Sequence, residues 1–231
     1  MNISKKQIFN LSLLMIFDLS LIVFRHLFTD GSWEQLASLD NMIMYRSQSF
    51  LFLLWNLFLA GIPLGIALVL YHLREQSFFH WIFWPGILLW LLFFPNSPYI
   101  ITDLIHIRPR AFMPLWYDTF TFFVFAWSGL YLGLLSIQLI AQLLKDRVGG
   151  ALSQMMIFGA ISLSGLGIAA GRFLRWNSWD VVANPALILQ DTLSLFTQME
   201  AHKNIWGMAI IFSLFLSLIY VFSKNQILCE K

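Results

Sequence analysis

Long apolar stretches separated by short polar segments dominate the sequence. A helix needs roughly 20 apolar residues to cross the hydrocarbon core of a bilayer. Each stretch is long enough to span, although the third is short and the fourth is long. We therefore predict an all-α fold, an integral membrane bundle of six transmembrane helices with short interfacial helices, built as a single transmembrane domain over residues 1–231. The predicted spans cover about residues 8–28, 50–72, 78–94, 116–144, 151–171 and 204–223.

Composition narrows the class of protein further. Of the 231 residues, 59% are hydrophobic and 11% are charged, whereas a water-soluble domain carries about 25% charged residues. A net charge of +2 is too small to indicate nucleic-acid binding. The single cysteine, Cys229, excludes an intramolecular disulfide and a site with several cysteine ligands. No nucleophile elbow, Walker loop, zinc-protease helix or dinucleotide fingerprint is present, so the sequence names no reaction and no cofactor.

The charges between the spans predict the orientation. Six spans place both termini on one side of the membrane, and five of the six lysines fall on that side, while most acidic residues fall on the other. Under the positive-inside tendency we expect a multi-pass protein of the cell membrane with cytoplasmic N- and C-termini. The first span is longer than the core of a signal peptide, so we expect it to be retained as an anchor. The lysines are Lys5, Lys6, Lys145, Lys224 and Lys231.

The first unusual polar segment follows the third span. Ser97 before Pro98 is typical of a helix start and predicts a short helix over about 98–107. Such a helix places Asp103 and His106, three residues apart, on one face. Pro114 begins the next helix, with Tyr117 and Asp118 in its first turn. Our hypothesis is that Asp103, His106 and Asp118 act as acid, base or metal ligands; the alternative is a set of interfacial hydrogen bonds, and metal binding stays open.

The second polar segment follows the fifth span. If that helix continues, Arg172 and Arg175 share a face and form a fork for a phosphate or carboxylate group. Their structural alternative is to neutralise nearby aspartates, namely Asp103, Asp118 or Asp180, or to reach the lipid headgroups.

Two further elements are predicted beyond these arginines. Asn177, followed three residues later by Asp180, resembles a capping box that opens another helix. Residues 186–200 then alternate apolar and polar positions in the manner of a helix lying in the membrane interface. The apolar positions are Leu189, Leu193, Phe196 and Met199.

The topology predicts one shared site. In a six-span protein the connections after the first, third and fifth spans lie on the same side, and these connections hold most of the unusual polar residues. We expect an outward-facing pocket in which one group of side chains binds the substrate. This group consists of Asn96, Tyr99, Tyr117, Arg172, Arg175, Asn177 and Asp180.

Three functions remain open on these residues. At this depth the natural ligand is an anionic lipid or a lipid-linked headgroup, which the protein would bind or process. A small-solute or ion transporter is the second possibility. Its path across the membrane needs polar residues inside the spans, and the only candidates are Asp18, Asn56 and Gln138. In the third, the protein is a structural or accessory subunit whose ionic residues tie helices together.

Two sequence patterns predict how the helices pack. Asp18 and Arg25 are seven residues apart in the first span, so both can turn inward on a similar face. The alternative for Arg25, near the outer end of this span, is to extend toward the lipid headgroups. Three pairs of glycines four residues apart allow close helix packing. These pairs are Gly61 with Gly65, Gly129 with Gly133, and Gly167 with Gly171.

Three strings in the polar segments carry a family resemblance. They are FPNSPYIITDLIHI at 94–107, PLWYD at 114–118 and GRFLRWNSWD at 171–180. With them the chain resembles an uncharacterised family of small bacterial polytopic membrane proteins, domain of unknown function 1361. The resemblance extends over most of the chain from the second span to the sixth. It implies an integral membrane protein and brings no catalytic residue with it.

Overall fold

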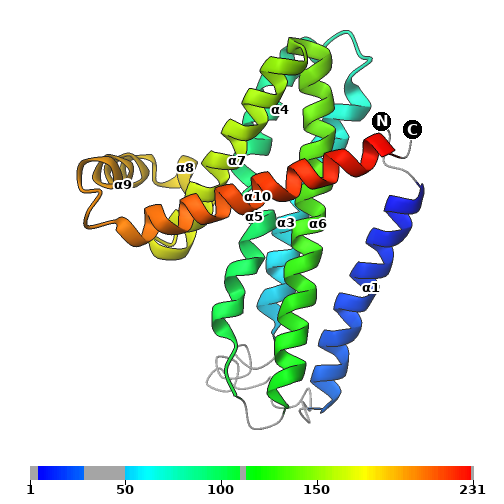
Figure 1. Cartoon of the computed structure of the whole chain (residues 1–231), viewed down its shortest axis with the longest axis vertical. Coiled ribbons are helices and arrows are strands. Elements are labelled where there is room, and N and C mark those ends of the chain that lie inside the picture. Colours follow the sequence, from blue (N-terminus) through cyan, green and yellow to red (C-terminus); the bar gives the residue numbers. More distant parts are fainter. Residues whose placement is uncertain (1–4, 29–49, 110–112, 230–231) are drawn as a thin grey trace. The chain divides into compact units, whose positions relative to one another are not determined.

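The structure, a computed structural model, describes residues 5–28, 50–109 and 113–229, and its regular elements are helices (Figure 1). Lys231, one of the lysines expected on the cytoplasmic side, lies outside the described residues. In chain order the helices are α1 Lys5–Phe28, α3 Leu51–Leu73, α4 Phe79–Phe93, α5 Asn96–Tyr99, the 3-10 helix η2 Ile100–His106, α6 Leu115–Val148, α7 Gly150–Phe173, α8 Asp180–Ala183, α9 Pro185–Thr197 and α10 Lys203–Cys229.

In the part of the chain that the structure describes, six stretches of helix are long and apolar enough to cross a membrane, which confirms the predicted all-α fold. The protein is therefore a multi-pass membrane protein. The third spanning stretch is longer than predicted, because α4 is followed directly by α5 and η2, and the helical run from Phe79 continues to His106.

The prediction of one helix over 98–107 was wrong in detail. The segment forms one turn of α-helix and then a 3-10 helix. Ser97 does not cap a helix start; its Oγ donates a hydrogen bond of 2.7 Å to the carbonyl oxygen of Ala60. The Ser97 side chain is fully buried, so its hydroxyl satisfies a neighbouring helix instead of the amides that follow it.

The chain separates into two compact units, and each is described by itself. Unit 1 comprises residues 1–62 and 96–133, and unit 2 comprises residues 63–95 and 134–231. In unit 1, α1 packs along the first part of α6 around a small core of Leu21, Met113, Tyr117 and Val124.

Gly129 brings α5 and η2 close to α6 in unit 1. A Cβ at this position would lie 2.6 Å from the carbonyl oxygen of Ser97 and 2.8 Å from the Ile100 side chain. The glycine therefore permits a close contact, whereas the side chain of any other residue would push these helices apart. The predicted role of small residues in close packing holds here, whereas Gly61 and Gly65 have open space around them.

In unit 2, α7 and α10 pack closely against each other (Figure 1). A side chain at Gly165 of α7 would collide with Ser213 and with the carbonyl oxygen of Ala209 on α10. Next to this contact, α9 joins the core through Leu195, which is buried with Ala169 and Ile205. The helix predicted within residues 186–200 is thus confirmed as α9.

Candidate functional site

The predicted site residues fall into the two units. Unit 1 contains the residues of the first polar segment and unit 2 contains those of the second. The expectation that both segments share one site stays a prediction. The residues in unit 1 are Asn96, Tyr99, Asp103, His106, Tyr117 and Asp118, and those in unit 2 are Arg172, Arg175, Asn177 and Asp180.

Asp118 is held in a buried ion pair with Arg25. The Arg25 Nε lies 3.0 Å from Oδ1 of Asp118, and Nη2 lies 3.4 Å from Oδ2. The guanidinium also stacks on the ring of Phe50, 3.9 Å from its centroid. The Arg25 and Asp118 side chains are 98% and 99% buried. This geometry favours a role in joining α1 to α6 over a role for Asp118 as acid, base or metal ligand.

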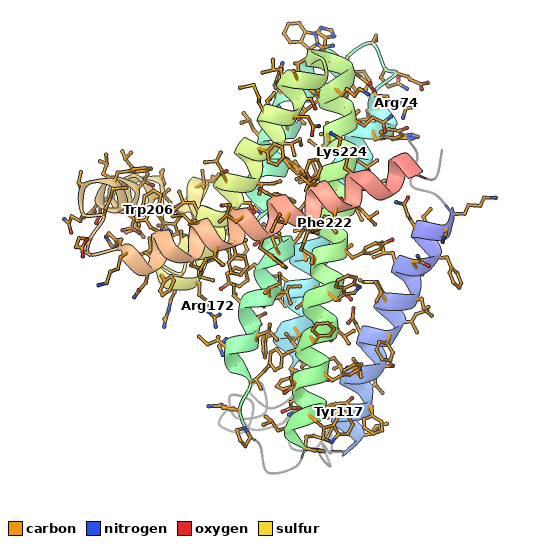
Figure 2. All side chains as sticks on the ribbon, viewed as in Figure 1. Arg74, Tyr117, Arg172, Trp206, Phe222 and Lys224 are labelled. Atoms are coloured by element: carbon orange, nitrogen blue, oxygen red, sulfur yellow. The ribbon has the colours of Figure 1, made fainter. Side chains whose placement is uncertain are left out.

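Tyr117, the neighbour of Asp118, also contributes to helix packing. Its hydroxyl donates a hydrogen bond of 2.7 Å to the carbonyl oxygen of Leu21 in α1, and its ring lies against Phe24. Figure 2 shows Tyr117 where the beginning of α6 meets the end of α1. The predicted contact of Tyr117 with a substrate therefore competes with a structural bond that its hydroxyl already makes.

Asp103 is buried and bonded to a neutral partner. Nδ2 of Asn56, on α3, donates a hydrogen bond of 2.6 Å to Oδ2 of Asp103. His106, three residues further along η2, is exposed and meets the edge of the Phe52 ring at 5.9 Å between centroids. Their predicted roles as acid and base stay predictions, as do the roles of the half-buried Asn96 and Tyr99.

A shared metal is not supported by the ligand geometry. Among the described residues, no three His, Cys, Asp or Glu side chains come together in a way that could hold a metal ion. Asp103, His106 and Asp118 are all described, so these three do not form a ligand set, whereas zinc needs at least three protein ligands.

The two arginines of unit 2 do not share a helical face, so this prediction was wrong. Helix α7 ends at Phe173, and Leu174 donates the last hydrogen bond back into it, to Ala170. Arg175 has a φ of +61°, in the left-handed region. A residue in this conformation stops the helix. Arg172 is half-buried in the last turn of α7 (Figure 2), and Arg175 is exposed just beyond it.

The predicted capping box is half formed. Oδ2 of Asp180 accepts a hydrogen bond of 2.7 Å from the backbone N–H of Asn177, which is the reciprocal bond of such a box. The residue preceding α8 is Trp179, and it makes no side-chain cap. Asp180 is thus occupied locally instead of neutralising an arginine.

Two further hydrogen bonds anchor the segment after α7. Trp176 Nε1 donates to Oδ2 of Asp191 on α9 at 2.9 Å, and Ser178 Oγ donates to the carbonyl oxygen of Leu92 on α4 at 3.0 Å. Asp180 and Asp191, the two aspartates near the arginines, therefore have partners of their own. Among the side chains that the structure describes, none forms a hydrogen bond or an ion pair with the Arg175 guanidinium.

Helices α8 and α9 expose large apolar side chains. The four apolar positions predicted to face lipid are all more than half exposed, with Leu189 at 62% and Met199 at 54%. On the other side, Leu195 is buried and its carbonyl oxygen accepts a hydrogen bond from Trp206 Nε1, next to α9 in Figure 2. The predicted amphipathic character is confirmed: α9 has one face packed against the protein and one exposed apolar face.

Some features of the site were not predicted from the sequence. The contact of Ser194 Oγ with Nε2 of His202, at 2.9 Å, was missed, as was the partner of Asp103. The only role predicted for Asn56 was in a transport path. A polar residue inside an apolar span also signals a buried partner, which here is Asp103. The left-handed backbone of Arg175 left no signal, because glycine is the residue that normally marks that conformation.

The comparisons with known proteins identify an uncharacterised family. The family described as "Protein of unknown function (DUF1361)" matches residues 55–219. This range includes all ten predicted site residues. No curated protein and no solved structure matches the chain.

Proposed function

We propose that this protein, which belongs to the family of unknown function DUF1361, binds the anionic headgroup of a lipid at the membrane–water boundary, with Arg175 as its main contact. Arg172 supplies a second positive charge and Asn177 a polar contact. In the orientation expected from the charges, this boundary is the outer one of the cell membrane, and both termini are cytoplasmic.

The backbone of Arg175 carries the proposal. At the position just after a helix, a left-handed residue is usually glycine. A residue with a Cβ pays about 1–2 kcal/mol there. Arg175 nevertheless has this conformation, with a φ of +61°. Strained backbone concentrates at functional sites. At this position the group that can have a function is the exposed guanidinium of Arg175.

The position of Arg175 along the chain supports a lipid ligand. The spanning helix α7 ends two residues earlier, at Phe173. Lipid phosphates lie where a spanning helix leaves the hydrocarbon core. Trp176 and Trp179 follow the arginine, and aromatic residues are enriched at such boundaries.

The helices that follow also suit this boundary. With 13 residues, α9 is about 20 Å long, which is too short to cross a core of about 30 Å. Its exposed apolar face fits a helix lying in the interface, so a headgroup bound to Arg175 would have its acyl chains beside α9.

The chemistry of the site favours phosphate. Guanidinium is charged at any physiological pH and donates two parallel hydrogen bonds to phosphate oxygens. Asp180 and Asp191 are engaged by Asn177 and Trp176, so they leave Arg175 available for an external anion.

Titration of the purified protein with lipid, followed by native mass spectrometry, tests the proposal. The wild type should bind phosphatidylglycerol more tightly than phosphatidylcholine. Arg175→Gly removes the guanidinium and relieves the backbone strain. Because a hydrogen bond to a charged group contributes about 1.5–3 kcal/mol, the affinity for phosphatidylglycerol should fall at least about tenfold.

Arg74→Gln is the matched control. Arg74 is a partly exposed arginine that contacts Glu75, so its replacement removes one positive charge elsewhere and should leave lipid affinity unchanged. Equal affinities of wild type and Arg175→Gly would refute the proposal. An equal loss in both variants would show that net charge, and not this site, determines binding.

A further inference from the structure

Asp18 is a carboxyl group enclosed in the middle of a spanning helix. It lies on the narrow buried face of α1 together with Leu21, Ile22 and Arg25, whereas most of the helix is exposed for contact with lipid. Its side chain has no exposed surface. An ionisable group at this depth is costly and marks a functional site by default.

Contacts on both sides of Asp18 fix what it faces on α6. Toward the N-terminus of α1, Asn10 lies beside the Tyr131 hydroxyl. Toward its C-terminus, Arg25 pairs with Asp118. The helices therefore run antiparallel, and Asp18 lies opposite the part of α6 between Asp118 and Tyr131. The Ser128 hydroxyl faces its carboxyl group.

The polar atoms at this point are unsatisfied. Both carboxyl oxygens of Asp18, Oγ of Ser128 and Oγ1 of Thr121 are buried, and each lacks a hydrogen-bond partner among the residues that the structure describes. Thr121 and Ser128 are seven residues, or about two helical turns, apart on one face of α6. Buried polar atoms are nearly always satisfied, so these oxygens point to a missing ligand.

The buried charges call for a cation. Arg25 is already engaged by Asp118 and by the Phe50 ring. The other titratable groups on the facing part of α6 are Tyr117 and Tyr131, which are not cationic. With Asp18 ionised, the buried charged residues described on α1 and the facing part of α6, namely Asp18, Arg25 and Asp118, have a net charge of −1. An unpaired carboxylate in such surroundings is strongly unfavourable.

We propose that Asp18 and Ser128 form the centre of an intramembrane binding site for a small monovalent cation, a proton or a sodium ion. The donors are a carboxylate and a hydroxyl, the oxygen ligands that hard cations prefer. Thr121 extends the donor set along α6. The cation joins α1 to α6, so its binding stabilises this helix pair by mass action.

The test measures the unfolding temperature of the full chain in neutral detergent under two series of conditions. In one, sodium replaces choline at constant pH and ionic strength; in the other, pH is lowered without sodium. Stabilisation of the wild type by sodium identifies a sodium site, and stabilisation by acid alone identifies a proton site. Asp18→Asn is uncharged and should respond to neither. Asp146→Asn, which removes an exposed carboxylate of the same helix α6, should respond as the wild type does.

Ser128→Ala keeps the inference testable if Asp18→Asn does not fold. This variant retains the carboxylate and removes one donor, so the cation concentration at half effect should change about tenfold. The proposal is overturned if the wild type responds to neither sodium nor acid, if Asp18→Asn keeps the wild-type response, or if Ser128→Ala leaves the half-effect concentration unchanged. Lipid binding at Arg175 is measured separately and is independent of all these results.

Discussion

Arg25 and Asp118 are 93 residues apart in the sequence, yet Nε of the arginine lies 3.0 Å from Oδ1 of the aspartate in a buried ion pair. The pair joins the last turn of α1 to the first turn of α6. A charge left alone in such a place is far more costly than the pair itself.

Replacement of one partner should therefore destabilise the protein strongly. We expect Arg25→Met or Asp118→Leu to lower the free energy of unfolding by about 3–5 kcal/mol. The double variant should recover most of this loss, because no charge is left unpaired. Chemical unfolding in detergent measures all three. Arg74→Met is the control: its pair with Glu75 has a similar length of 3.1 Å but is exposed, so the expected loss is below about 1 kcal/mol.

Asp103→Asn should fold normally, because the amide oxygen of asparagine can accept the hydrogen bond from Asn56 that the carboxylate accepts now. Asp103→Leu removes the acceptor and should cost about 1–3 kcal/mol. Folded yield after size-exclusion chromatography distinguishes the two variants. If the folded yield of Asp103→Asn falls as far as that of Asp103→Leu, the negative charge itself is required for folding, and the account of this contact is wrong.

Gly129→Ala should loosen the contact of α5 with α6, since its Cβ would lie 2.6 Å from the carbonyl oxygen of Ser97. Overpacking of this kind costs about 1–3 kcal/mol. Gly61→Ala is the matched control in a spanning helix with open space around it, and it should gain up to about 1 kcal/mol from helix propensity. Changes of opposite sign in the unfolding temperatures of the two variants would support this account, and equal changes would contradict it.

The orientation is testable with the single cysteine. If both termini are cytoplasmic, a membrane-impermeant maleimide should not label Cys229 in intact cells and should label it after the membrane is opened. In a cysteine-free background, a cysteine placed at the exposed Asn177 should show the opposite pattern. Labelling of Cys229 in intact cells would reverse the predicted topology.

The helices were predictable because spanning a bilayer imposes a simple rule. Each span must satisfy its own backbone hydrogen bonds and present apolar side chains over a fixed length. That rule identified all six spanning stretches. The seven-residue spacing of Asp18 and Arg25 likewise predicted a shared helical face, and of the two alternatives for Arg25 the structure has the inward one.

The details of the site were less predictable, because they depend on partners far away in the sequence. Ser97 has the signature of a helix cap, but a tertiary acceptor at Ala60 takes its hydroxyl. The spacing of Arg172 and Arg175 predicted a shared face, but the helix ends at Phe173 and Arg175 itself has a left-handed backbone. Local patterns do not report either effect, since both are decided by packing.

The unfolding temperature of Arg175→Gly, measured with and without phosphatidylglycerol, tests the central claim most directly. Without the lipid, the variant should be at least as stable as the wild type, because glycine suits a φ of +61°. With the lipid, the wild type should gain stability and the variant should gain little or none. If Arg175→Gly is stabilised by phosphatidylglycerol as much as the wild type is, Arg175 does not bind the headgroup and the proposed function is wrong.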